Sequence, residues 1–473
     1  MRVRCTKWFA TLIVVQLLSV ATICSGDDSA VDFASLRDEN WHQWRGPAAD
    51  GVAPHAHPPV HWDESNNVRW KVNVPGESSA TPIVWGDRVF VVAAVETDRE
   101  LDEPPPDDEY SKTQAPKRFY RFVVTCLDRH SGAERWSHVA REAVPHQGRH
   151  YTNTYASASP TTDGQRLYVS FGSQGIYCYN LDGELLWQRD FGKMRTRYGW
   201  GEATSPVVHQ DRLVVNWDHE DDSALYLLDA ETGRTLWRVD RDEPTSWATP
   251  LLAEHDGQTQ IVVNGTNFAR GYDFDDGSEL WRCDGQTINA IPSPVAADGI
   301  TYCMSGKGAS ALYAIPLSSR GDVSNLFDIA DRGEEVSGRN RQNDAGLAWQ
   351  YPHDTPYVPS PLLHCGRLYF TRSNSAIISC LDASSGAVIF GPERLPNLSS
   401  LYASPVAADG HVFLVGRDGT TLVIRAAATL DVVATNTLDA RIDASPAIVG
   451  DQLFLRGHEA IYCLESSGDR TGR

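Results

Sequence analysis

The sequence predicts an all-β fold: an eight-bladed β-propeller of four-stranded antiparallel blades, with its ring closed by an N-terminal strand. Three observations predict it. A Ser/Thr-Pro pair recurs at a nearly constant spacing, a glycine turn followed by an aromatic residue recurs between these pairs, and short alternating runs such as RLYVSFG fill the rest. Long amphipathic helix patterns are missing from the sequence.

The Ser/Thr-Pro pair marks the inner strand of each blade. It occurs eight times, and the phrase SPVAADG is spelled twice, at 293–299 and 404–410. Five of the seven intervals between the prolines are 41 to 46 residues long, and the other two are 67 and 78. A period in the low forties built from short strands is typical of a propeller blade. The prolines are Pro82, Pro160, Pro206, Pro250, Pro294, Pro361, Pro405 and Pro446.

The second landmark is an acidic turn closed by glycine, as in LDAETGRTLW at 228–237. The aspartate can hydrogen-bond back onto the turn, and the glycine adopts the positive φ that a tight hairpin needs. We expect the aromatic ring four residues later to point from the outer strand into the gap against the next blade, as packing rather than catalysis. The pairs are Gly132 and Trp136, Gly183 and Trp187, Gly233 and Trp237, Gly277 and Trp281, and Gly386 and Phe390.

The ends of the repeat array predict how the ring closes. The last repeat stops at AIYCLESSG without an aromatic outer strand, whereas NVRWKVNVPG at 67–76 has such a strand and no repeat of its own. The N-terminal strand should therefore complete the eighth blade and remove both sheet edges. Blade one carries an acidic, proline-rich excursion at 96–119, which we interpret as a solvated loop. Blade five carries an insertion at 318–344, after which Trp349 should be its displaced outer-strand aromatic.

The N-terminus has the pattern of a secretory signal peptide. Arg2, Arg4 and Lys7 precede an apolar run at 9–23, and Ser25 and Gly26 follow it. About 15 apolar residues are fewer than the ~20 that a spanning helix needs, so we expect an exported protein without a transmembrane segment, periplasmic or secreted. The expected segments are the signal peptide (1–26), an extended leader (27–66), the propeller (67–467) and a C-terminal tail (468–473).

The net charge indicates which partners the protein can bind, and the cysteines indicate whether disulfide bonds hold the fold. The net charge of −20 becomes about −23 without the signal peptide, which excludes nucleic acid as a partner because such a surface repels phosphates. Seven cysteines remain in the mature chain, an odd and scattered set that forms no disulfide framework. Four of them precede turn glycines and should be small core residues: Cys126, Cys178, Cys380 and Cys463.

These blades resemble the pyrroloquinoline-quinone-like (PQQ-like) propeller repeat family, whose signature of Asp, Thr-Gly and Trp is close to LDAETGRTLW and LDRHSGAERW. The leader NWHQWRGPAADGV resembles the start of secreted bacterial propellers of this family. The resemblance implies either a quinoprotein dehydrogenase or a scaffold of the BamB type, which helps to assemble outer-membrane proteins. The enzymes hold the quinone over the channel between a Trp and a disulfide of adjacent cysteines, beside a calcium ion. This chain has no two adjacent cysteines.

The residues just before each inner strand are the candidates for a site, because in a propeller they line one mouth of the central channel. Aromatic and polar groups that converge on a funnel favour binding of a ligand or peptide, and we expect none of them to be catalytic. They are Ser79, Tyr155, Trp200, Glu202, Trp247, Asn289, Tyr357, Tyr402 and Asp443. We expect no metal site; His146 and His150, four residues apart, lie in an irregular connection where the spacing favours a solvated loop.

We therefore expect a monomeric, non-catalytic binding or assembly scaffold of the bacterial cell envelope, with an envelope protein or glycan as partner and no cofactor. One alternative is a PQQ-dependent dehydrogenase, with Trp200 or Trp247 stacking on the quinone and Glu202, Asn289 or Asp443 near calcium. A further alternative is a carbohydrate-binding propeller, because Trp and Tyr at a channel mouth also suit sugar rings.

Overall fold

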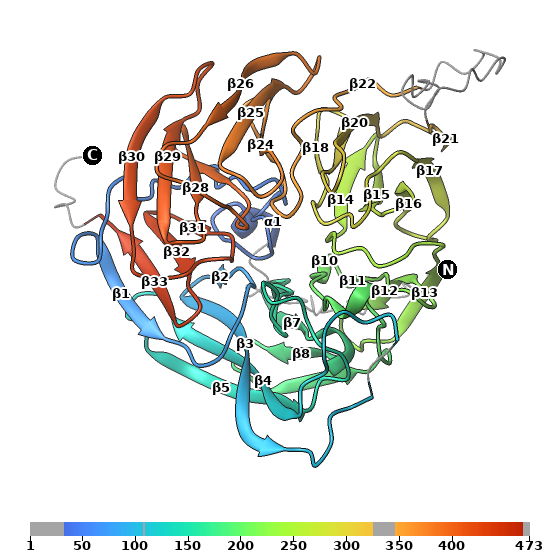
Figure 1. The fold of residues 1–473 in the computed structure, drawn as a ribbon, viewed down its shortest axis with the longest axis vertical. Helices are drawn as coiled ribbons and strands as arrows, with labels where there is room; N and C mark the ends of the chain where they lie inside the picture. The colour runs from blue at the N-terminus through green and yellow to red at the C-terminus, as the bar shows by residue number, and fades with distance from the viewer. Residues whose placement is uncertain (1–32, 107–108, 325–345, 467–473) are drawn as a thin grey trace, which may run out of the picture.

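The structure is a computed structural model that describes residues 33–106, 109–324 and 346–466. The predicted signal peptide, the C-terminal tail and most of the blade-five insertion lie outside the described residues. Within them, eight antiparallel sheets stand around a central axis, as the closed ring in Figure 1 shows. No described helix is long and apolar enough to cross a membrane.

Each of the first four blades runs from an inner to an outer strand in chain order. Blade one is β2 (Ile83–Trp85), β3 (Arg88–Glu100), β4 (Arg118–Asp128) and β5 (Glu134–Ala143). Blade two is β6 (Thr161–Thr162), β7 (Arg166–Ser170), β8 (Ile176–Asn180) and β9 (Leu185–Arg189). Blade three is β10 (Val207–His209), β11 (Arg212–Trp217), β12 (Ala224–Asp229) and β13 (Thr235–Asp240). Blade four is β14 (Leu251–His255), β15 (Gln258–Asn264), β16 (Ala269–Asp273) and β17 (Glu279–Cys283), to which β21 (Gly321–Asp322) adds a parallel fifth strand.

The remaining blades follow the same plan. Blade five is β18 (Val295–Ala297), β19 (Ile300–Ser305), β20 (Ala311–Pro316) and β22 (Trp349–Gln350), which confirms Trp349 as the displaced outer-strand aromatic. Blade six is β23 (Leu362–His364), β24 (Arg367–Thr371), β25 (Ile377–Asp382) and β26 (Val388–Arg394). Blade seven is β27 (Val406–Ala408), β28 (His411–Val415), β29 (Thr420–Arg425) and β30 (Val432–Thr437). Blade eight is β31 (Ala447–Val449), β32 (Gln452–Arg456), β33 (Ala460–Glu465) and β1 (Val68–Asn73).

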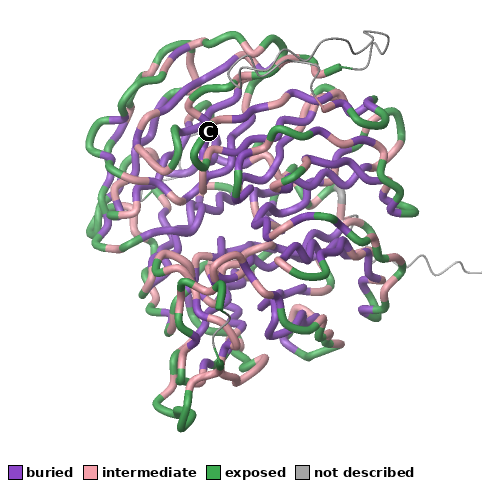
Figure 2. The backbone as a smooth tube through the Cα atoms, turned by 45° about the vertical axis from the view of Figure 1, so that its right-hand side comes forward, coloured by how far each residue is buried: buried purple, intermediate pink, exposed green. Residues whose placement is uncertain are grey.

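The predicted closure is confirmed. Strand β1 pairs antiparallel with β33, with Val72 opposite Ile461, so the first strand of the chain is the outer strand of the last blade. The blades bury their faces against each other, and Figure 2 shows the buried positions mostly in the interior of the molecule and the exposed ones mostly at its outside. The four predicted core cysteines are buried and free.

The outer-strand tryptophans pack between neighbouring blades, as predicted. Five indoles each donate a hydrogen bond to a backbone carbonyl of the next blade: Trp70 to Arg129, Trp136 to Leu181, Trp187 to Ala230, Trp237 to Phe274 and Trp349 to Ala383. A Cβ on Gly233 would lie 2.7 Å from the Trp187 ring, so the turn glycine also makes room for the docked indole. Trp281 differs: its indole donates to Gln260 of its own blade and packs over Gly271, where the bare backbone admits it.

The leader crosses the channel next to the inner strands and contacts two of the Ser/Thr-Pro pairs. After α1 (Phe33–Arg37), which lies near the centre of the ring in Figure 1, Trp41 is fully buried and forms a β-bridge with Val84. Val52 forms a bridge with Ala407 on the other side of the ring. Between them, the buried guanidinium of Arg45 donates to the carbonyls of Pro361 and Pro405, 2.6 Å away in each case. The leader therefore plugs one end of the channel.

The excursion of blade one is exposed over most of its described residues, as its composition predicted, but it is not an open loop throughout. Strands β3 and β4 continue into it as a hairpin, and its far end packs on the connection before blade three. The Lys112 N–H donates to the Tyr198 carbonyl, and its ammonium lies 3.8 Å from the centre of the Tyr198 ring. The Thr113 hydroxyl donates to the Gly199 carbonyl, so these contacts satisfy the backbone groups that an open loop would leave to water.

Candidate functional site

The hydroxyl groups of the Ser/Thr-Pro pairs form a chain of hydrogen bonds around the channel axis, which explains why the pair recurs. In seven of the eight repeats the hydroxyl oxygen accepts a hydrogen bond from the backbone N–H of the equivalent residue in the preceding blade. The bonds, 2.8 to 3.2 Å long, run from Thr81 to Ser159, Ser205, Thr249, Ser293, Ser360, Ser404 and Ser445 in turn. The ring is open only at the seam between blades eight and one, where the Thr81 hydroxyl has no partner among the described residues. We call these eight residues the hydroxyl ring.

A cavity of about 500 Å³ lies above this ring and is called the mouth cavity here. Six Trp and Tyr side chains line it: Trp44, Tyr151, Trp200, Trp247, Tyr357 and Tyr402. Members of the hydroxyl ring form its floor, namely Ser159, Ser205, Thr249, Ser404 and Ser445, and Trp44 of the leader also reaches it. The volume is within the range of small-molecule sites. Because the leader closes the far end of the channel, the cavity opens to one side only.

The structure brings most of the predicted site residues together. Trp200, Trp247, Tyr357, Tyr402 and Asp443 line the mouth cavity, as does Ser79. Tyr155 and Glu202 instead line a smaller cavity between blades two and three. Asn289, 2% exposed, is not among the lining residues of either cavity, and its amide oxygen has no hydrogen-bond partner among the described residues.

The carboxylate of Asp443 is paired with neighbouring basic side chains. Its carboxylate accepts hydrogen bonds from Arg417 at 2.5 Å and Arg441 at 3.3 Å, and lies 3.0 Å from Nε2 of His458. Burial opposes ionisation, but the hydrogen bonds of His458 and Arg417 outweigh it and lower the pKa of Asp443. The Arg417 guanidinium in turn lies 3.9 Å from the centre of the Tyr402 ring. The one carboxylate of the mouth cavity is therefore matched by more than one positive charge.

Lys307 adds an unmatched charge. Its ammonium lies 4.9 Å from the centre of the Tyr357 ring, and no described carboxylate forms an ion pair with it. Burial, with help from Lys307 and Arg417, lowers the pKa of His150, which also lines the cavity, so this imidazole is neutral at pH 7. The mouth cavity is thus positive in a chain whose net charge is −20.

Glu202 occupies the smaller cavity, of about 50 Å³. It accepts hydrogen bonds from the N–H (2.7 Å) and the hydroxyl (2.5 Å) of Ser173. Burial raises the pKa of Glu202 to about 7, against the lowering effect of these two bonds. Gly172 has a φ of 55°, and a Cβ there would lie 1.6 Å from the Glu202 carboxylate, so this position requires glycine.

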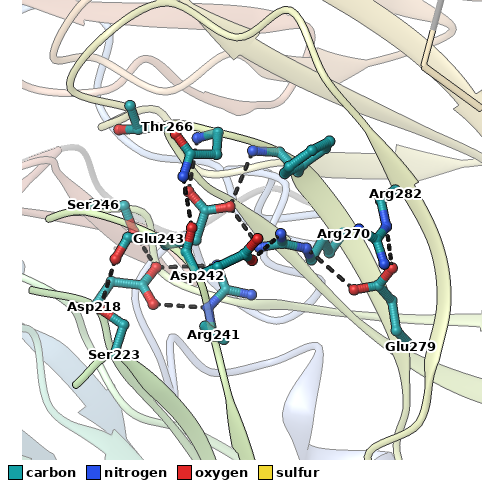
Figure 3. Close-up of polar contacts among 12 residues, drawn as sticks. Asp218, Ser223, Arg241, Asp242, Glu243, Ser246, Thr266, Arg270, Glu279 and Arg282 are labelled. Atoms are coloured by element: carbon teal, nitrogen blue, oxygen red, sulfur yellow. Dashed lines mark hydrogen bonds and ion pairs between the residues drawn. The ribbon is translucent and has the colours of Figure 1, made fainter. Parts of the chain in front are cut away.

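A buried charge network fixes the connection that carries Trp247 (Figure 3). Arg241 and Asp218, both fully buried, pair at 2.7 Å, and the Ser246 hydroxyl donates to Asp218 at 2.5 Å. Glu243 pairs with Arg270 of blade four at 2.5 Å. At the end of this segment the Trp247 indole donates to the Gly201 carbonyl at 2.7 Å. Because every buried charge in this network is paired, the wall formed by blades three and four is held in one arrangement.

Comparison with known proteins identifies the family. A family model described as outer membrane protein assembly factor BamB matches residues 121–391, more than half of the chain. The chain belongs to the BamB family. The BamB structure from Moraxella catarrhalis is 12% identical, covers 81% of this chain and 100% of its own, and has a TM-score of 0.49. No curated protein matches the sequence.

Solved structures outside BamB share the fold of this BamB-family propeller. The quinohemoprotein alcohol dehydrogenase from Comamonas testosteroni is 11% identical with a TM-score of 0.60, and the match covers 92% of this chain and 82% of that one. Quinohemoprotein alcohol dehydrogenase ADHIIG from Pseudomonas putida HK5 is 12% identical with a TM-score of 0.57, covering 94% and 83%. Identities this low show the fold alone.

The residues named for calcium do not fit such a site in this BamB-family chain. Glu202 lies in the smaller cavity, Asn289 lines neither cavity, and both oxygens of Asp443 face cationic groups, which compete with a metal ion. The described residues contain no group of three His, Cys, Asp or Glu that could hold a metal ion. His146 is no exception, since its Nε2 lies 2.8 Å from the Met194 carbonyl. No cysteine is among the described residues that line the mouth cavity.

Sequence reasoning missed several residues that shape the mouth cavity of this BamB-family protein. Lys307 and Asn374, which line it, and Arg417, whose guanidinium covers Tyr402 there, all lie in loops between the second and third strands of their blades. These loops face the same mouth as the connections that precede the inner strands, so inspecting both sets of loops would have found them. Trp44 gives no such signal, because its place depends on the path of the leader across the ring.

Proposed function

We propose that this BamB-family propeller is a non-catalytic binding or assembly protein of the cell envelope, and that the mouth cavity is its binding site. One observation carries the proposal: a cavity of about 500 Å³, lined by six Trp and Tyr side chains and closed from behind by the leader, lies where eight blades converge. Large aromatic rings with few polar groups are typical of binding sites. The family description, an outer membrane protein assembly factor, supports the envelope.

The partner meets the protein at the rim of this cavity. Tyr151 lines the cavity and is nevertheless 82% exposed, the most exposed large hydrophobic side chain among the described residues. A large exposed aromatic residue beside a pocket is typical of an interaction site. The partner is an envelope protein or glycan, and the protein acts as a monomer exported by its signal peptide; fractionation and N-terminal sequencing of the mature chain test the export.

Photo-crosslinking in intact cells tests the site. A benzophenone amino acid at Tyr151 should capture an envelope component, whereas the same probe at Leu236, 43% exposed on the outer strand β13, should not. Trp200→Ala in the Tyr151-probe protein should abolish the crosslink, because it removes one aromatic wall without touching a side-chain hydrogen bond of the ring. Equal capture at both positions, or capture that survives Trp200→Ala, would overturn the proposal.

A thermal unfolding experiment on the purified protein distinguishes this binding role from that of a quinone-dependent dehydrogenase. Thermal unfolding with excess PQQ and millimolar calcium should show no saturable change in midpoint. A bound cofactor at a hundredfold excess over its dissociation constant would stabilise the fold by about 2.7 kcal/mol. A saturable rise of that size would favour the dehydrogenase, and alcohol oxidation would then be assayed.

A further inference from the structure

The floor of the mouth cavity consists of hydroxyl donors. Each ring hydroxyl in the floor uses its oxygen to accept a backbone N–H, and no described group accepts the proton of any of them. A hydroxyl that accepts one hydrogen bond becomes a better donor, because hydrogen bonds polarise one another. The floor thus offers up to five convergent O–H groups, from Ser159, Ser205, Thr249, Ser404 and Ser445.

The charges around the cavity favour an anion for these donors. Lys307, Arg417 and Arg441 stand against the single carboxylate of Asp443, which is already paired. Low-dielectric walls focus the field of such charges toward a ligand inside a cleft. The positive mouth therefore selects negative ligands even though the protein as a whole is acidic.

The aromatic walls of the mouth cavity and its scarcity of free hydrogen-bond acceptors indicate what the uncharged part of the ligand is. Aromatic faces suit flat or ring-shaped bodies, and Tyr151 extends this surface to the rim. The side-chain amide oxygens of Asn153 and Asn374 already accept hydrogen bonds from the backbone N–H groups of Thr154 and Val358. A polypeptide brings fixed N–H donors, for which the cavity has few free acceptors, whereas a sugar hydroxyl can accept with its oxygen and turn its own proton toward water.

From these three features we infer that the mouth cavity binds an acidic saccharide. Its carboxylate or phosphate group is held by the floor hydroxyls and Lys307, and its sugar rings lie against Trp200, Trp247 and Tyr402. This deepens the proposed function and rests on it. The anionic group can come from a uronic acid or from a sugar phosphate, and both sources share the chemistry that the floor recognises.

Calorimetry on the purified mature chain tests the ligand class. The probes are trigalacturonate, glucose 6-phosphate, neutral maltotriose and inorganic phosphate. We expect at least one acidic sugar to bind about tenfold or more tightly than maltotriose, and more weakly as salt is added. Trigalacturonate against glucose 6-phosphate distinguishes the carboxylate source from the phosphate source. Equal binding of inorganic phosphate would show an adventitious anion site, and equal binding of maltotriose would show no charge selection; either overturns the inference.

Matched variants test the two parts of the site. Lys307→Gln should weaken acidic-sugar binding about tenfold to a hundredfold, as expected for a charged hydrogen bond. Lys71→Gln removes a lysine with a similar ring contact, 4.7 Å from the centre of Tyr462 outside the cavity, and should leave affinity unchanged. Likewise Ser404→Ala should weaken binding, whereas Ser293→Ala, a ring position that is not among the cavity-lining residues, should not. Unchanged affinity in both Lys307→Gln and Ser404→Ala would refute the site.

The two proposals fail in different ways. If no saccharide binds but the Tyr151 probe still captures an envelope component, the ligand class is wrong and the mouth remains a binding site. If neither saccharide binding nor crosslinking is found, the proposed function itself fails.

Discussion

Replacing Glu202 by Gln should stabilise the protein, and the gain should grow with pH. Glu202 is enclosed between blades two and three and receives hydrogen bonds only from Ser173 in the described structure. No arginine or lysine lies against it to stabilise its charge. Gln keeps the size of the side chain and an oxygen that accepts from Ser173, but it carries no charge to bury.

The magnitude follows from the pKa. Burial raises the pKa of Glu202 from 4.5 to about 7. Because the folded state holds its proton more tightly than the unfolded chain, ionising Glu202 costs folding free energy as pH rises through this window. One pKa unit corresponds to about 1.36 kcal/mol, so the full penalty is about 3 kcal/mol above pH 7. Between pH 5 and pH 8, the free energy of unfolding of Glu202→Gln should rise by about 2 to 3 kcal/mol relative to the wild type.

Urea unfolding of both proteins at pH 5, 6, 7 and 8 measures this difference. Glu96→Gln is the control: hydrogen bonds from Tyr120 and Arg118 lower the pKa of Glu96 below 4.5 despite some burial, so Glu96 is ionised at all four pH values and the effect of its substitution should stay nearly constant from pH 5 to pH 8. A Glu202→Gln difference that is flat between pH 5 and 8 would refute the reasoning, because only a raised pKa makes it change with pH.

Three further predictions concern the framework of the site, each measured by urea unfolding at constant pH. Ser404→Ala should lower the free energy of unfolding by about 1 to 3 kcal/mol, because the buried N–H of Ser360 in the preceding blade loses its acceptor. Thr81→Val should lower it by less, since the Thr81 hydroxyl accepts no bond among the described residues. Trp187→Ala should cost about 3 to 5 kcal/mol through loss of the contact between blades, against about 0.5 kcal/mol or less for the exposed neighbour Leu186→Ala. Arg45→Met should lower the free energy of unfolding by at least about 3 kcal/mol, because three carbonyls lose their donor. It should also make the leader sensitive to protease. A leader as resistant to protease as in the wild type would contradict its role as a plug.

The fold was predictable because each blade carries its own signals. The Ser/Thr-Pro pair and the turn glycine lie within one blade, so the number of blades and the closure by β1 could be read without knowing any distant contact. The exception is instructive. Trp281 has the same spacing from its turn glycine as the other tryptophans, yet it rests on Gly271 of its own sheet, a position whose lack of a Cβ the turn pattern does not include.

The candidate site was predictable only in part because it is assembled from irregular segments. Strand residues alternate between two faces, but the connections before the inner strands have no such alternation. Trp200 therefore faces the mouth while Glu202, two residues later, points into the neighbouring cavity through the space that Gly172 leaves. Lys307 follows a second strand instead of preceding an inner one, so its place depends on which loops share a mouth.

The leader belongs to the site even though it precedes the first blade. In a channel open at both ends, bulk water would reach the hydroxyl ring from both sides and satisfy its donors. Arg45 and Trp44 close one side, with Arg45 bonded to a carbonyl 360 residues away. A site with less water has a lower effective dielectric, so the charges of Lys307 and Arg417 act more strongly on a ligand there. The affinity of the mouth cavity for an anion should therefore depend on the leader, and Arg45→Met should weaken it without touching any residue that contacts the ligand.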